Sequence, residues 1–132
     1  MRVATATGHF FHSFNNFFPE LEVIDPKKRN INDFNLVIFT GGEDINPRYY
    51  GQDNTHSSYN DMRDDIETNI LRQCLDYQIK ILGVCRGHQL INAYLGGDMV
   101  QDIYLDTNEY HESDHVLKFN STYSLIKYLY DG

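Results

Sequence analysis

Two short apolar runs, each ending in a small-residue turn, constrain the fold of this chain more than any other feature. Leu36–Phe39 is followed by Thr40–Gly42, and Ile79–Val84 is followed directly by Cys85. Such runs are typical of strands buried on both faces of a parallel sheet. Between them, Asp61–Tyr77 carries apolar side chains at helical intervals. Strands that alternate with helices predict an α/β sheet built from right-handed crossovers, covered on both faces.

The remaining segments complete one predicted domain. The five phenylalanines within His9–Phe18 recur at helical spacing and predict a buried face. We find no internal repeat or linker and expect a single domain over residues 1–132. Further strands are expected at Val3–Thr5, Leu21–Ile24, Met99–Ile103 and His115–Phe119, a polar loop at Thr107–Asp114, and helices at Arg86–Leu95 and Ser121–Tyr130.

Charge and composition exclude several classes of partner. Eleven Lys and Arg stand against nineteen Asp and Glu, a net charge of −8 that repels nucleic acid and anionic lipid. No apolar stretch approaches the roughly 20 residues of a membrane span. The sequence lacks a P-loop or G-x-G-x-x-G motif, so no nucleotide cofactor is expected. Two cysteines are too few for a disulfide framework, which predicts free thiols and a cytoplasmic protein.

Cys85 is the candidate nucleophile. It lies at a strand-to-helix junction with glycine two residues away on either side, at Gly83 and Gly87, which is the layout of a nucleophile elbow. The helix N-terminus and Arg86 are expected to favour the thiolate. The backbone N–H after the cysteine and those of Gly41–Gly42 predict an oxyanion hole. A small buried side chain is the alternative for Cys85.

Cys74 and the histidine-rich segment carry no chemistry in this interpretation. Cys74 lies in the middle of a predicted helix without nearby glycine, so we interpret it as a buried core residue. His111–His115 spells the H-E-x-x-H pattern of zinc peptidases, but its polar context disfavours a helix. A solvated loop is the favoured interpretation, and no metal is expected.

The motif residues together resemble a known family. Gly83–Gln89, continued to Ile103, is similar to the elbow of class I glutamine amidotransferases, in particular their γ-glutamyl hydrolase branch, peptidase family C26. The resemblance covers about residues 36–129 in the expected order. Further matching segments are Gly41–Pro47 with Tyr50-Gly51, Arg63-Asp64 with Glu67, and His115-Val116.

The resemblance implies a flavodoxin-like three-layer sandwich that hydrolyses glutamine or another γ-glutamyl amide without a cofactor. Cys85 would form a thioester, and the N–H groups of Gly42 and Arg86 would hold the oxyanion. Gln89 and Gly41 would contact the glutamyl part of the substrate. If ammonia is passed on, the implied partner is a separate synthetase chain. Pairing with a second copy of this chain is a further expectation, because a domain that lacks its last elements would expose apolar surface.

One departure from the family pattern leaves alternatives open. The sequence stops at Gly132, before the segment in which the family carries its catalytic histidine and acidic partner, so we expect a C-terminally incomplete domain. It is a piece of a longer protein, a chain completed by another, or a member that binds glutamyl compounds without turnover. His9 is the candidate substitute base. A redox sensor that uses Cys85 is a further alternative.

Overall fold

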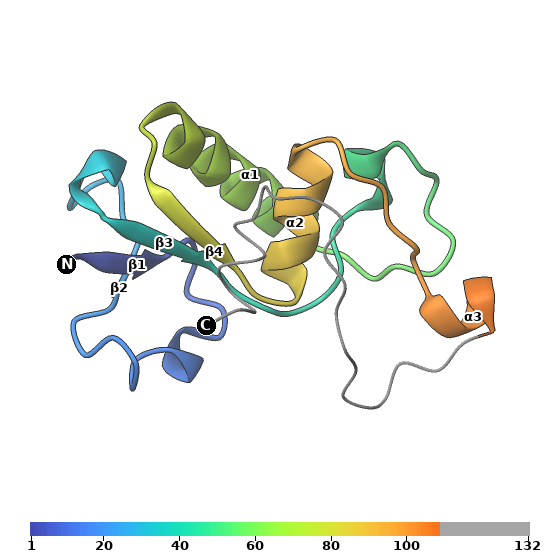
Figure 1. Ribbon diagram of the computed structural model, residues 1–132, viewed down its shortest axis with the longest axis horizontal. Coiled ribbons are helices and arrows are strands. Elements are labelled where there is room, and N and C mark those ends of the chain that lie inside the picture. The colour runs from blue at the N-terminus through green and yellow to red at the C-terminus, as the bar shows by residue number, and fades with distance from the viewer. Residues whose placement is uncertain (109–132) are drawn as a thin grey trace, which may run out of the picture. The chain divides into compact units, whose positions relative to one another are not determined.

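The computed structural model describes residues 1–108 of the chain. Its centre is a four-stranded sheet of order β2-β1-β3-β4 in which each described pair of neighbours is parallel (Figure 1). The non-sequential order requires crossover connections, as the alternation of strand and helix patterns predicts. The α/β prediction is therefore confirmed. The strands are β1 (Val3–Thr5), β2 (Glu22–Val23), β3 (Leu36–Phe39) and β4 (Lys80–Gly83).

Alternate side chains of the strands enter two apolar clusters, one on each face of the sheet. Helices α1 (Asp61–Asp76) and α2 (Arg86–Tyr94) lie together on one face (Figure 1). Val37, Phe39 and Ile81 belong to the cluster that these helices cover. Ile38 of the same β3 strand belongs to the opposite cluster, as the period of two along a strand requires. The flavodoxin-like arrangement follows from this burial on both faces.

The aromatic segment covers the second face, but not as the helix that its spacing predicts. It forms the short 3-10 helix η1 (Phe11–Ser13) among turns, and Phe10 adopts a left-handed backbone with φ 54°. Phenylalanine and asparagine are poor helix formers, and Asn15-Asn16 and Pro19 favour turns. The prediction of a buried face is wrong for Phe10 and Phe17, which are 57% and 77% exposed. Phe11, Phe14 and Phe18 pack against the second cluster as expected.

Helix α1 has a well-defined start. The Asn60 side chain is its N-cap and accepts a hydrogen bond of 3.1 Å from the Arg63 N–H, while Asp61 and Asp64 place negative charge in the first turn. Two further 3-10 helices, η2 (Ile31–Asp33) and η3 (Pro47–Tyr50), lie in the connections on either side of β3. Across residues 1–108, the helices fall short of the length and apolar character of a membrane span.

The strand predicted at Met99–Ile103 is wrong. Instead of joining the sheet, this segment is tied to the loop after η3: the Gln52 side chain donates to the Met99 carbonyl at 2.9 Å, and the Gln101 side chain donates to the Asp53 carbonyl at 2.8 Å. A short helix, α3 (Ile103–Thr107), begins a second compact unit, which starts at Ile103. The elements predicted at 115–119 and 121–130, and the H-E-x-x-H segment 111–115, lie outside the described residues.

Gly87 offers a sharp test of the packing between α2 and β3. A Cβ atom there would overlap the carbonyl oxygen of Phe39 and lie 2.8 Å from its Cβ, so backbone must move. We expect Gly87→Ala to lower the free energy of unfolding by about 3 kcal/mol, the upper end of the usual cost of overpacking. Urea denaturation measures the change.

Gly8→Ala is the matched control. A Cβ at Gly8 meets nothing within 4 Å, so its effect should stay within about 0.5 kcal/mol. Equal effects of the two substitutions would contradict the close contact between α2 and β3.

Candidate active site

The candidate site is centred on Cys85, at the junction of β4 and α2. Cys85 is the N-cap residue of α2, with φ 53° and ψ −110°, and its side chain is exposed. A non-glycine residue rarely adopts this backbone conformation, which costs on the order of 1–3 kcal/mol. The sharp turn that the sequence predicts is therefore present, and the alternative of a buried cysteine is wrong.

The two glycines that flank Cys85 are required by close packing. A Cβ at Gly83 would lie 2.7 Å from the carbonyl of Gly87 and 2.7 Å from Ile91 Cδ1. A Cβ at Gly87 would overlap Phe39 of the neighbouring strand. Helix α2 can thus start directly behind β4 only because both positions lack side chains.

The second predicted strand end lies beside the first. Phe39 of β3 pairs with Gly83 of β4, so the residues that follow each strand emerge at the same edge of the sheet. A Cβ built on Gly41 would lie 3.6 Å from Cys85 Cβ. Within residues 1–108, the N–H groups of Gly42 and Arg86 donate to no backbone carbonyl. These two groups are thus available as hydrogen-bond donors beside Cys85.

Gln89 lies one helical turn after Cys85 and faces the loop that follows β3. Its Nε2 lies 3.4 Å from Asp44 Oδ1, a weak hydrogen bond between two elements of the site. The Gln89 N–H donates to the Cys85 carbonyl at 3.1 Å, which starts the helix. The structure therefore brings together the five residues that the sequence selects: Gly41, Gly42, Cys85, Arg86 and Gln89.

The Arg86 side chain has a different position from the one expected. Its guanidinium is fully buried and donates to the carboxylates of Asp64 and Glu67 on α1. Its positive charge is committed to two buried negative charges, which removes the basis for expecting it to stabilise the Cys85 thiolate. The feature that does lie next to Cys85 is the N-terminus of α2, where free backbone N–H groups carry partial positive charge.

A second buried arginine, Arg63, fixes the turn formed by Gly41 and Gly42, the glycine turn. Its Nε donates to Glu67 Oε1 at 3.0 Å, and its NH2 group donates to the Gly41 carbonyl at 2.8 Å. A Cβ at Gly42, where φ is 139°, would overlap the same guanidinium. In the sequence, Arg63 is recognisable only as part of a family motif. Its contact with the turn could not be predicted, because the sequence does not show that α1 packs against that turn.

Glu43 is a partly buried acidic residue that lies near both arginines. Burial alone would raise the pKa of this carboxyl, but a backbone hydrogen bond and the charges of Arg63 and Arg86 outweigh it and hold the pKa below its usual range. Glu43 Oε2 lies 3.4 Å from an Arg63 nitrogen, and Oε1 lies 3.9 Å from Arg86 Nε. A negative charge is therefore retained next to the glycine turn.

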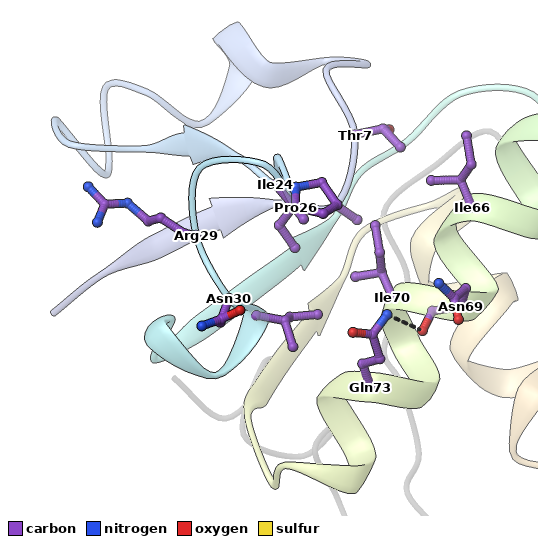
Figure 2. Close-up of a pocket in the computed structure, with 11 residues that line it drawn as sticks. Thr7, Ile24, Pro26, Arg29, Asn30, Ile66, Asn69, Ile70 and Gln73 are labelled. Atoms are coloured by element: carbon purple, nitrogen blue, oxygen red, sulfur yellow. Dashed lines mark hydrogen bonds between the residues drawn. The ribbon is translucent and has the colours of Figure 1, made fainter.

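A separate pocket of about 430 Å³ lies between α1 and the connection from β2 to β3. Figure 2 shows Ile24, Ile66 and Ile70 among the side chains around it, from both sides of the cavity. None of the five candidate site residues lines this pocket. Thr7 lines it and also donates to Glu67 at 2.8 Å, so the pocket adjoins the buried charge network.

The fold and this site together define a class I glutamine amidotransferase-like protein: a parallel α/β sheet with an elbow cysteine beside a glycine turn. The model of the Peptidase C26 family matches residues 17–127, which is most of the chain. The chain therefore belongs to the Peptidase C26 family.

Curated relatives resemble about half of the chain. A Schizosaccharomyces pombe protein named "Putative glutamine amidotransferase PB2B2.05" is 39% identical over 70 residues, which are 51% of this chain and 28% of that protein. The "Putative glutamine amidotransferase-like protein YvdE homolog" of Lactococcus lactis subsp. cremoris is 37% identical over 76 residues, 55% of this chain and 40% of the relative. The matches thus span well under half of these relatives' lengths.

The two cysteines should differ sharply in reactivity. Cys74 is fully buried in α1, and burial raises the pKa of its thiol from 9.0 to about 12. Only the thiolate is nucleophilic, so at pH 8 iodoacetamide should modify Cys85 and leave Cys74 unmodified. Peptide mass spectrometry identifies the labelled residue.

Denatured chain provides the control, because both cysteines should then react. Similar labelling of Cys74 and Cys85 in the native chain would contradict the packing of α1. The same burial makes the fold lose stability as the pH rises from 9.0 toward about 12, since only the unfolded thiol ionises freely there.

Proposed function

We propose that this protein cleaves a γ-glutamyl amide, such as glutamine, through a thioester on Cys85. One observation carries the proposal: an exposed cysteine on a strained turn lies beside two N–H groups that have no backbone acceptor within residues 1–108. Membership of the Peptidase C26 family supports the same class of chemistry.

The proposed first step is acylation. The Cys85 thiolate attacks the γ-carbonyl carbon, and the N–H groups of Gly42 and Arg86 stabilise the negative oxygen of the tetrahedral intermediate. The C–N bond then breaks, and the leaving nitrogen takes a proton from solvent water and departs as the amine. This leaves a glutamyl thioester, which water cleaves to glutamate and the free thiol.

The proposed glutamyl contacts lie around Gln89. Its amide is half-buried and faces Asp44, and a glutamyl group has an ammonium and a carboxylate that these two side chains can bind. Gly41 would bring backbone close to the substrate. Two free thiols are consistent with a reducing compartment, and we propose a cytoplasmic location. Ammonia transfer to a synthetase, or pairing with a second copy, belongs to the same proposal.

A diazo-ketone analogue of glutamine tests whether the glutamyl pocket is formed. We expect one label per chain, located on Cys85, with a rate that saturates as the analogue concentration rises. Mass spectrometry of the intact chain and its peptides measures both. Excess glutamine should slow the labelling because it occupies the same pocket.

Cys85→Ser is the matched control and should remain unlabelled. Labelling that is linear in concentration and no faster than with a generic alkylating agent would contradict a glutamyl pocket. If peroxide oxidised Cys85 and glutamine analogues had no effect, the redox-sensor alternative would replace this proposal.

A further inference from the structure

His9 lies at the same edge of the sheet as the candidate nucleophile. It follows β1, which is the neighbour of β3 in the sheet. The Thr40 hydroxyl donates to the His9 carbonyl at 2.6 Å, and Thr40 directly precedes Gly41. The adjacent Phe10 ring comes within 3.5 Å of the Cβ position of Gly42. Residues 9 and 10 therefore pack against the turn that lies beside Cys85.

A hydrogen-bond chain fixes the imidazole of His9. His9 Nδ1 lies 3.1 Å from Thr7 Oγ1, and the same hydroxyl oxygen lies 2.8 Å from Glu67 Oε1. The buried side chain of Glu67 accepts in each of its hydrogen bonds here, from Thr7, Arg63 and Arg86, and a carboxylate can only accept. The Thr7 hydroxyl has one proton, and it donates that proton to Glu67 rather than to His9, because hydrogen bonds to carboxylates are stronger than those to a neutral imidazole.

The tautomer of His9 follows from this arrangement. Once the Thr7 hydroxyl donates to Glu67, its oxygen can only accept from His9, so the Nδ1 atom must carry the proton. In a neutral imidazole the other nitrogen, Nε2, is then an acceptor. His9 is an exposed residue at this edge of the sheet. A buried ion network thus sets the hydrogen-bonding character of a surface side chain.

We propose that His9 is a substrate-contacting residue of the Cys85 site, held by Thr7 and Glu67 as the Nδ1–H tautomer, and that its Nε2 accepts a hydrogen bond from the amide nitrogen of a γ-glutamyl substrate. This inference rests on the proposed function. It assigns His9 to binding the leaving amine and gives Thr7 a positioning role.

Nitrogen-15 NMR of the histidine rings tests the tautomer without any need for activity. We expect His9 to show the Nδ1–H pattern in the full chain, and Thr7→Val to convert it to the Nε2–H form that free imidazole prefers. His12 is an internal control: it lies on the same segment, and among the described residues its Nδ1 contacts only the side-chain amide of Asn15, at 3.4 Å. A predominant Nε2–H form of His9 in the unchanged chain, or no response to Thr7→Val, would overturn the proposal.

Titration of the Cys85→Ala chain with γ-glutamyl-p-nitroanilide tests the contact itself. We expect the His9 Nε2 resonance to move together with the amide resonances of Gly41 and Gly42. His9→Asn keeps a donor near Thr7 but has no atom at the Nε2 position, and should weaken binding roughly 3- to 10-fold, the range of one hydrogen bond. His12→Asn should leave the affinity unchanged.

The outcomes separate this inference from the proposed function. If the anilide moves the Gly41 and Gly42 resonances but not His9, the site binds glutamyl compounds and the His9 contact is wrong. If the anilide moves no resonance, the proposed function fails. The proposed contact between His9 and the substrate then fails too, whichever tautomer His9 shows.

Discussion

The buried ion pairs between two arginines and two acidic residues of α1 hold the candidate site together. Arg86 comes from the elbow helix, and Arg63 reaches from α1 to the carbonyl of the glycine turn. Both meet at Glu67, while Asp64 binds Arg86 and also accepts from the Asn46 N–H at 2.9 Å. The loop that follows β3 and the first residue of α2 are thus both tied to one turn of α1.

Such a network is costly to build and positions groups more effectively than it stabilises the fold. Removing four charges from water carries a large desolvation penalty, and well-packed apolar residues can often replace a buried ion pair without loss of stability. Losing one partner is different, because an unpaired buried charge typically costs about 3–5 kcal/mol. Here the network holds the Gly41 turn through Arg63, and the Thr7–His9 hydrogen bonds extend the same constraint to the surface.

Strand order explains why the site forms at this edge. In open parallel sheets, ligands bind beyond the carboxyl ends of the strands, near the point where the strand order reverses. Here that point lies between β1 and β3, and His9, the glycine turn and Cys85 follow β1, β3 and β4 in spatial order. Residues 9, 41 and 85, far apart in the sequence, therefore become neighbours along one line.

The sequence predicts local features of this site well and long-range ones poorly. The elbow is recognisable because Gly83 and Gly87 flank Cys85 at fixed spacing, and the apolar runs identify β3 and β4. The charge network escaped prediction because Arg63, Glu67 and Arg86 are residue types that usually face solvent, and only the crossover through α1 brings them together. Met99–Ile103 has strand-like composition, yet side-chain hydrogen bonds to the loop after η3 tie the start of this segment outside the sheet.

The central claim is that Cys85 attacks a γ-glutamyl carbonyl, and the acyl-enzyme is its most direct observable. The chain can be mixed with γ-glutamyl-p-nitroanilide, quenched in acid after a short time and weighed by mass spectrometry. The account predicts one glutamyl group per chain, bound to Cys85, released by neutral hydroxylamine as expected of a thioester, and absent from Cys85→Ser. An unmodified Cys85 at every time point, in a chain whose thiol still reacts with iodoacetamide, would contradict it.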